Sequence, residues 1–165
     1  MIYIFKDVVT STQDMLKASY KDVLHGTFLC AGFQTQGHGQ FDRAWESEKN
    51  QNILCSLLIK PQSLTEDIQK IVSATIIAYL HQMGIDATFK APNDIMVNSQ
   101  KICGVLVDQI IEADHVKAVI IGIGLNVNQQ QFHGKNATSM AIVHQQRFDL
   151  EEIRLDIYEL LKRFI

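Results

Sequence analysis

The sequence lacks the dense clusters of lysine and arginine that a nucleic-acid-binding surface usually needs. Its 165 residues contain 15 basic and 18 acidic side chains, and the formal net charge is -3. A protein that binds nucleic acid more often carries a basic stripe. We therefore expect that this chain does not bind nucleic acid on its own.

Long apolar runs are also missing. The amino-terminal stretch MIYIFKDVV has no basic segment followed by a long apolar one, which a secretory leader would require. No other run approaches the roughly 20 residues that a membrane-spanning helix needs. We predict a cytoplasmic protein with no membrane partner.

Cysteine is scarce, and its spacing matches no metal or redox motif. Cys30, Cys55 and Cys103 are odd in number, each lies inside an apolar run, and none belongs to a CxxC pair. This pattern favours buried free thiols in a reducing compartment.

The composition that remains is that of one ordinary globular domain. The apolar fraction of 47% and the charged fraction of 20% argue against disorder, and no repeat or linker interrupts the chain. A chain of this length comfortably supports a single core, so we expect one domain over residues 1–165.

Short runs rich in β-branched residues and leucine predict strands at 2–5, 27–33, 53–59 and 116–127. Residues 97–100 predict a hairpin turn that leads into a long strand over 101–113. Helices are predicted from Ser11 through Leu24, from the Ser63 and Glu66 capping box to Gly84, and over 148–164 behind the capping pair Asp149 and Glu152. This order predicts an α+β fold, in which helices back a mixed β-sheet.

Four segments are unusually polar or rich in glycine where the chain leaves a strand or helix. In the first, residues 10–14 (TSTQD), hydroxyl groups either cap a helix or bind a small polar ligand at its positive end. In the second, residues 34–47 (QTQGHGQFDRAWES), glycines either serve turns or free backbone amides for phosphate, with Arg43 adding charge.

The third segment, residues 89–106, places Asn93 and Asp94 after Pro92 and between Lys90 and Lys101. These residues either surround a solvated hairpin or form a site for a carboxylate or phosphate and its metal ion. In the fourth, residues 120–128 (IIGIGLNVN), glycines inside a buried strand indicate that another element or a ligand packs closely against the backbone.

In this order, the four segments resemble the catalytic domain of biotin protein ligases from about residue 7 to residue 139. STQ is similar to the family's Ser-Thr-Asn, and the loop at 34–47 resembles its glycine- and arginine-rich loop that ends in tryptophan. KAPNDI is similar to Lys-Trp-Pro-Asn-Asp, KICGVL to Lys-hydrophobic-Ala-Gly-Ile-Leu, and GIGLNVN to Gly-Ile-Gly-Ile-Asn-hydrophobic-Asn. NATSM at 136–140 also resembles a family segment.

The resemblance implies a reaction in two steps. Biotin and ATP, with Mg²⁺, give biotinyl-5'-AMP and pyrophosphate, and a lysine of a biotin carboxyl-carrier domain then attacks the activated carbonyl. Because activation joins two anions, the site needs positive charge and oriented amides.

The resemblance also assigns residues to roles. Lys101, assisted by Lys90 and Arg43, is implied to supply the catalytic charge, and Asp94 is implied to contact Mg²⁺ or to orient the lysines. The biotin site would comprise Ser11, Thr12, Gln34, Gly37, His38, Lys101 and Gly104. The ATP site would comprise Gln40, Arg43, Trp45, Asn93, Lys101 and Asn126.

The loop departs from the family pattern Gly-Arg-Gly-Arg-x-Gly-Arg. It reads GHGQFDR, so His38 and Gln40 replace two arginines and Asp42 replaces a glycine. Since glutamine carries no charge and histidine is charged only when protonated, we expect the adenylate to be held less firmly.

Two alternatives stay open. One is a degenerate paralogue that binds biotin or its adenylate without efficient transfer, and the other is a lipoate ligase or octanoyltransferase on the same scaffold. We expect neither an amino-terminal helix-turn-helix nor a small carboxy-terminal β-domain. The sequence leaves open whether the protein forms a homodimer.

Overall fold

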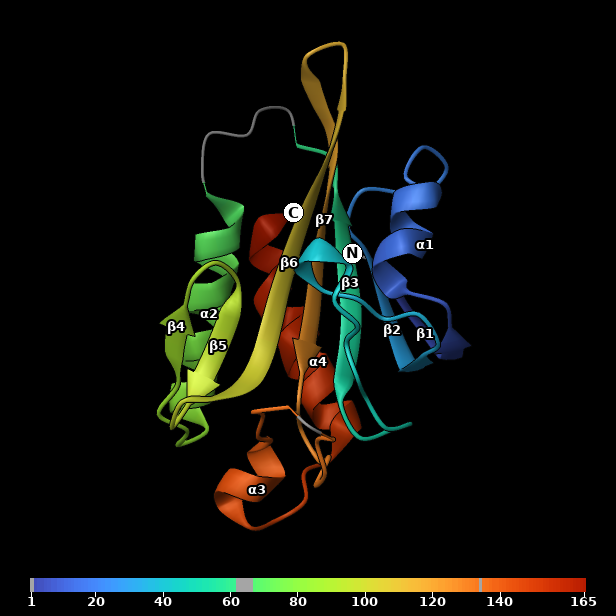
Figure 1. Cartoon of the computed structure of the whole chain (residues 1–165). Coiled ribbons are helices and arrows are strands. Elements are labelled where there is room, and N and C mark those ends of the chain that lie inside the picture. The colour runs from blue at the N-terminus through green and yellow to red at the C-terminus, as the bar shows by residue number, and fades with distance from the viewer. Residues whose placement is uncertain (1, 62–66, 134) are drawn as a thin grey trace.

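A seven-stranded mixed sheet forms the centre of the molecule, with strand order β1-β2-β3-β7-β6-β5-β4 (Figure 1). The computed structural model describes residues 2–61, 67–133 and 135–165. Only the β1–β2 pair is parallel among the neighbouring strands described. The strands are β1 Ile2–Val9, β2 Thr27–Gln34, β3 Ile53–Ile59, β4 Thr88–Lys90, β5 Asp94–Val97, β6 Gln100–Glu112 and β7 His115–Leu125.

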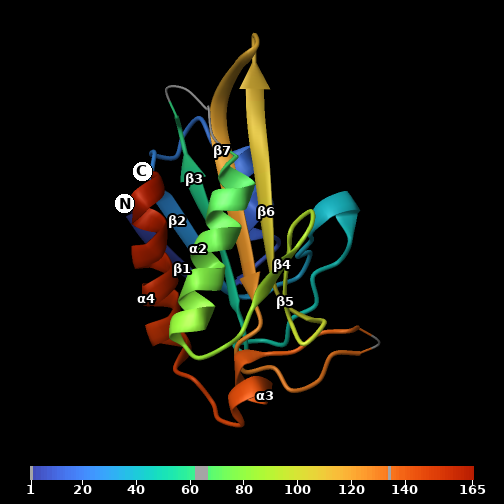
Figure 2. The same ribbon diagram turned by 90° about the vertical axis from the view of Figure 1, so that its left-hand side faces the viewer.

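Helices cover the sheet, and Figure 2 shows α2 and α4 on one side with the loop after β2 on the other. The α-helices are α1 Thr12–Ala18, α2 Ile68–Gln82, α3 Met140–His144 and α4 Leu150–Leu161, and the 3₁₀-helices are η1 Gln40–Asp42 and η2 Lys162–Phe164. Among the described residues, no helix combines the length and apolar character required to traverse a bilayer.

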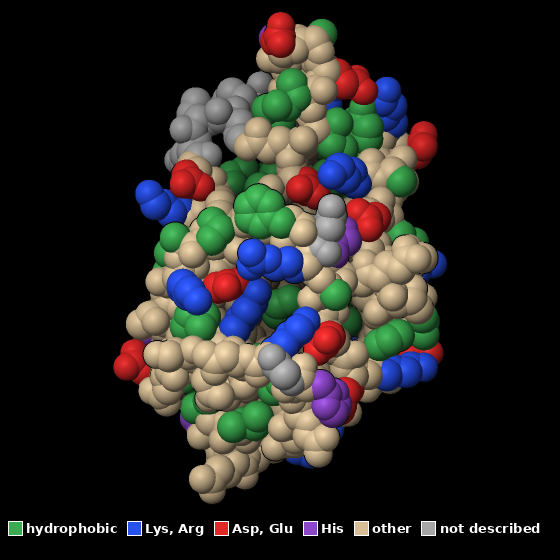
Figure 3. Space-filling model, viewed as in Figure 1, with side chains coloured by type: hydrophobic (Ala, Val, Ile, Leu, Met, Phe, Trp, Pro, Cys, Tyr) green, Lys and Arg blue, Asp and Glu red, His purple; other side chains and the backbone are tan. Residues whose placement is uncertain are grey.

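Strand alternation divides the apolar side chains between the two faces of the sheet. Leu29 of β2 and Ile120 of β7 pack with Leu16 of α1. On the same face, the alternate positions of β7 are Gly122 and Gly124, so the sheet beside α1 carries little side-chain bulk there. Near the centre of the view in Figure 3, Lys and Arg side chains gather on the surface.

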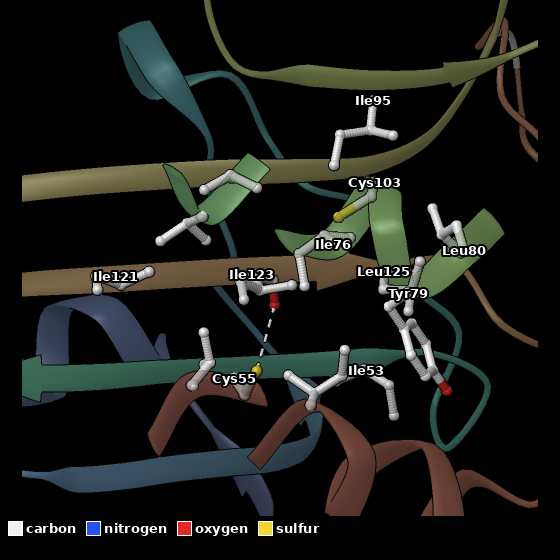
Figure 4. Close-up of a cluster of buried hydrophobic side chains, with 14 of the residues drawn as sticks. Ile53, Cys55, Ile76, Tyr79, Leu80, Ile95, Cys103, Ile121, Ile123 and Leu125 are labelled. Carbon is white, nitrogen blue, oxygen red and sulfur yellow. Dashed lines mark hydrogen bonds between the residues drawn. The ribbon is translucent and has the colours of Figure 1, made fainter. Parts of the chain in front are cut away.

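The opposite face carries the main core. Cys55 of β3 and Ile123 of β7 pack there with Ile76 of α2 and Ile157 of α4, all of them buried. Figure 4 shows residues of this cluster, with the Cys55 thiol directed at the Ile123 carbonyl. This dense core forms a rigid support for the thinner face opposite.

The predicted α+β class with a mixed sheet backed by helices is confirmed. The strand predicted at 53–59 has those bounds, and the predicted turn at 97–100 joins β5 to β6 through Asn98 and Ser99, which have φ values of 48° and 64°. The capping pair predicted for α4 is also present, because the Asp149 carboxylate accepts from the amide of Glu152.

Other predicted boundaries are wrong. The helix predicted from Ser11 to Leu24 ends at Ala18. The Ser19 amide makes its last backbone bond, to the Met15 carbonyl, and the amides of Asp22 and Val23 then both donate to the Ser19 carbonyl in a separate turn. The first strand extends beyond residue 5 to Val9, and the strand predicted to reach residue 127 ends at Leu125. The short helix α3 was not predicted.

The predicted start of α2 lies outside the described residues. The predicted Ser63 and Glu66 capping box falls there, and the described helix has Asp67 as its cap, with its carboxylate accepting from the Lys70 amide. Its end agrees with the prediction, since Gly84 follows with a φ of 75°.

The packing of α4 generates a stability prediction. Ile157→Ala should lower the free energy of unfolding by about 2–5 kcal/mol, because it leaves a cavity in the core. Leu155→Ala in the same helix is the control, since Leu155 is 46% exposed and should cost less than about 0.5 kcal/mol. Urea denaturation of both variants measures the difference, and equal losses would contradict this placement of α4.

Candidate active site

A cavity of about 40 Å³ lies on the sheet face that carries α1. The start of α1, the loop after β2, and strands β3, β6 and β7 surround it. Eight of the predicted site residues line it: Ser11, Thr12, Gln34, His38, Trp45, Asn93, Lys101 and Gly104. Segments that are far apart in the sequence therefore meet at one place.

One wall of this cavity is a network of polar side chains. The side-chain oxygen Oε1 of Gln34 accepts from the Thr12 backbone amide at 2.7 Å and from the Thr12 hydroxyl at 3.0 Å. The Thr12 hydroxyl also lies 2.9 Å from that of Ser56. Ser11 caps α1 by accepting from the Asp14 amide at 3.2 Å, which confirms the capping interpretation of TSTQD. Ser11 also lines the cavity, and its role in ligand binding stays a prediction.

Gln13 is a lining residue that the sequence did not predict. Its side-chain nitrogen donates to the Ile120 carbonyl at 3.0 Å, and its oxygen accepts from Ser56 at 2.9 Å. That oxygen is 2.5 Å from where a Cβ atom on Gly122 would lie. The glycine inside a buried strand was therefore the signal that could have identified a close neighbour.

The loop after β2 is a compact hairpin. The Gly39 amide donates to the Arg43 carbonyl at 2.8 Å, and the Trp45 amide donates to the Gly37 carbonyl at 2.9 Å. Arg43 is exposed near the tip, with its guanidinium carbon 5.8 Å from the centre of the Phe41 ring. The polar segment is thus ordered by its own backbone bonds, as well as exposed at its tip.

The Trp45 ring packs directly against glycines of two adjacent strands. Gly104 of β6 and Gly124 of β7 are register partners. A Cβ atom on Gly104 would lie 2.9 Å from the ring, and one on Gly124 would lie 2.6 Å from it. Because real Cβ atoms do not approach other heavy atoms so closely, the indole needs glycine at both positions.

Lys101 lies beside this indole. Its ammonium is 2.6 Å from an Asp94 carboxylate oxygen and 5.1 Å from the centre of the Trp45 ring. The lysine side chain is 30% exposed and that of Asp94 is 25% exposed. The carboxylate therefore fixes the position of the charge, and two of the three ammonium donors are left for a ligand.

A second cavity, of about 100 Å³, lies on the other side of the Trp45 and Lys101 pair. Asn126 and Lys135 line it too, whereas Trp45 and Lys101 line both cavities. Within the described part of the chain, the buried Trp45 Nε1 and Asn126 Oδ1 have no hydrogen-bond partner. This leaves one unused donor and one unused acceptor on residues of the second cavity.

His38 is paired with Asp14 at the first cavity. Its Nε2 lies 3.0 Å from each Asp14 carboxylate oxygen. Burial lowers the pKa of His38, but the hydrogen bond to Asp14 and the charges of Asp14 and Asp108 outweigh it, so the pKa is raised above its usual value. The pair ties the loop after β2 to α1.

Other predicted residues belong to the lining of neither cavity. Lys90 is exposed in β4, opposite Asp94 of β5, so that β5 separates it from β6. Gln40 and Arg43 belong to neither lining, and Gly37 borders a separate groove. Their predicted roles in catalysis and binding stay predictions.

Metal-binding residues are sparse in what the structure describes. No group of three or more His, Cys, Asp or Glu side chains lies together among the residues 2–61, 67–133 and 135–165. Cys30, Cys55 and Cys103 are free and buried, as predicted. Burial raises the pKa of the Cys103 thiol to about 12 despite the opposing charge of Lys101, so this thiol is a poor nucleophile.

Comparison with known proteins agrees with this geometry. The family model described as the biotin/lipoate A/B protein ligase family matches residues 5–126. The bifunctional ligase/repressor BirA of Bacillus spizizenii is 35% identical over 132 residues, which cover 77% of this chain and 41% of the relative. BirA of Bacillus subtilis is 34% identical over the same coverage, so the chain spans about two fifths of these curated relatives.

A solved structure is similar over nearly the whole chain. The biotin protein ligase from Aquifex aeolicus in complex with biotin and ATP has a TM-score of 0.84 and 28% identity, with 98% of this chain and 69% of that chain covered. The family model matches most of the chain, including every residue that lines the first cavity, and this match decides the assignment. This chain belongs to the biotin/lipoate A/B protein ligase family.

Proposed function

We propose that residues 1–165 form a catalytic domain that activates biotin with ATP and transfers it to a lysine of a carboxyl-carrier domain. The position of Lys101 and Trp45 between two cavities is the observation that carries this proposal. A reaction that joins two anionic substrates needs both of them bound side by side, with a positive charge where they meet. The similar Aquifex aeolicus ligase was solved with biotin and ATP together.

The lining of the first cavity suits the ureido ring of biotin, and the cavity of about 40 Å³ must widen to admit the whole molecule, since ligand sites usually measure about 300–1,000 Å³. The polar wall of Thr12, Gln34 and Ser56 offers donors and acceptors to a ureido ring, while Leu54 and Leu106 offer apolar surface to the rest of the molecule. The biotin carboxylate would then point toward Lys101.

The second cavity suits the nucleotide. Adenine carries both an amino donor and ring-nitrogen acceptors, and these complement the unused acceptor Asn126 Oδ1 and the unused donor Trp45 Nε1. The indole also provides an aromatic surface on which a base can stack. In this arrangement the α-phosphate lies on the Lys101 side of the base.

The first step forms a bond between a biotin carboxylate oxygen and the α-phosphorus and breaks the bond to pyrophosphate. Lys101 would offset the repulsion between the two anions, and Asp94, 2.6 Å from it, would hold its ammonium in place. Correct orientation of bound reactants can itself supply roughly 7–11 kcal/mol of barrier lowering.

The second step is the attack of the acceptor lysine amine on the activated carbonyl carbon. The carbonyl-to-oxygen bond then breaks, AMP leaves with the electron pair, and the amine loses a proton. Lys90 and Arg43 are exposed outside the two cavities, where we place them as contacts for the acceptor or the phosphates.

Magnesium fits this site as an ion that arrives with ATP. Mg²⁺ is usually held by one or two carboxylates together with substrate phosphates. Asp94 is the proposed carboxylate, although its ion pair with Lys101 favours a role in positioning that lysine. The phosphates would therefore provide most of the coordination.

The proposed function is tested by incubating the protein with ATP, Mg²⁺, labelled biotin and a carboxyl-carrier acceptor. We expect label on the acceptor lysine and labelled adenylate in its absence. Binding of biotin without transfer would instead support a degenerate paralogue, and preference for lipoate or octanoate would support the other branch of the family.

Lys101→Ala should reduce adenylate formation in this assay by at least about a hundredfold, because the charge at the boundary is lost. Lys49→Ala is the matched control, since Lys49 also forms an ion pair with an aspartate, Asp7, but is exposed and belongs to neither lining. Normal turnover in Lys101→Ala, with a circular dichroism spectrum like that of the native chain, would refute the assigned role.

The His38 and Asp14 pair predicts how adenylate retention depends on pH. Because the folded pKa of His38 is raised, the charged pair is complete below the unperturbed value of about 6.5 and weakens as the pH rises through the raised value. Dissociation of biotinyl-5'-AMP should therefore become faster as the pH rises above about 6.5.

Two variants check this pH dependence. Asp14→Asn should shift the pH profile to lower pH, because His38 loses the carboxylate that raises its pKa. His38→Arg combined with Gln40→Arg should hold the adenylate longer at every pH, since arginine stays charged. Dissociation rates measured by stopped flow that do not change with pH in the native protein would contradict the role of the pair.

A further inference from the structure

Lys135 is a cation at the second cavity that neither the motifs nor the proposed mechanism uses. It lies between β7 and α3, and its ammonium donates to the Ala44 carbonyl at 3.0 Å. An oxygen of Glu46 lies 3.5 Å away. Lys135 and Lys101 both line this cavity, from different segments of the chain.

The backbone beside Lys135 is attached to that of Lys101. The Lys101 amide donates to the Asn136 carbonyl at 3.0 Å, and the Thr138 amide donates to the Lys101 carbonyl at 2.9 Å. These bonds form a parallel bridge between Lys101 and Ala137. The backbone segments that carry the two lysines are therefore fixed beside one cavity, which both side chains line, and this favours a shared ligand.

The counter-ion of Lys135 is easier to displace than that of Lys101. Asp94 lies 2.6 Å from Lys101, and its side chain is 25% exposed. Glu46 is 3.5 Å from Lys135, and its side chain is 49% exposed. Because an exposed ion pair contributes little free energy, a phosphate can replace Glu46 at small cost.

We propose that Lys135 binds the phosphate chain of the nucleotide beside Lys101, an inference that rests on the proposed function of the second cavity. The loop after β2 supplies no cation to this cavity, since Arg43 is outside its lining. Lys135 provides that charge from the segment between β7 and α3. When phosphate binds, its ammonium exchanges Glu46 for the stronger negative charge.

Binding of ATP with Mg²⁺, measured by calorimetry without biotin, tests this assignment. Lys135→Ala should weaken ATP binding about tenfold, as expected for loss of one charge-assisted hydrogen bond, and leave biotin binding unchanged. Lys135→Gln keeps a donor for the Ala44 carbonyl but removes the charge, and it should bind ATP as weakly as Lys135→Ala. Lys135→Arg should restore binding.

Glu46→Gln gives a test of opposite sign. It removes the competing carboxylate, so ATP should bind more tightly, by about threefold. If the Lys135 and Glu46 pair merely fastened the loop, this variant would weaken binding instead. Lys162→Ala is the control, because Lys162 forms a comparably exposed pair with Glu159 on α4 and should leave ATP binding unchanged.

The outcomes separate this inference from the proposed function. Adenylate formation by the native protein with unchanged ATP affinity in Lys135→Ala would overturn the role of Lys135 alone. Lys135-dependent ATP binding without adenylate formation would support Lys135 and overturn the ligase activity. A native protein that does not bind ATP would overturn both.

Discussion

The packing of the Trp45 indole against Gly104 and Gly124 is the contact on which the arrangement of the site depends. Without side chains at these positions, two adjacent strands accept a large aromatic ring directly on their backbone. The ring divides the space over the sheet into two cavities, and Lys101 lies at the division. A side chain on either glycine would displace the ring and merge or close the spaces that we assign to biotin and to the nucleotide.

The sequence predicted this site better than it predicted the ends of the elements around it. Periodicity identified the strands, and glycine inside β7 indicated a close neighbour that proved to be Gln13 and Trp45. Helix α1 was predicted too long because the turn that follows it, in which the amides of Asp22 and Val23 donate to the Ser19 carbonyl, has no strong sequence signal. Gln13 and Lys135 were missed because their positions at the cavities come from tertiary contacts.

The loop after β2 is poor in arginine, and the site instead has cations that are paired with carboxylates. His38 is held by Asp14, Lys101 by Asp94 and Lys135 by Glu46, so each of these three cations has a carboxylate near it before any ligand binds. These carboxylates orient the cations but also compete with an anionic ligand. We therefore expect a site whose affinity for the adenylate depends more on pH and salt than that of a site built from arginines.

The most direct test of the central claim is a crystal structure of this chain with a non-hydrolysable analogue of biotinyl-5'-AMP. The account predicts the biotin ring in the cavity of Thr12 and Gln34, the adenine in the cavity of Asn126, and the Lys101 ammonium within hydrogen-bond distance of the linkage between them. An analogue bound entirely on one side of Trp45, or a Lys101 ammonium that does not contact the linkage, would contradict it.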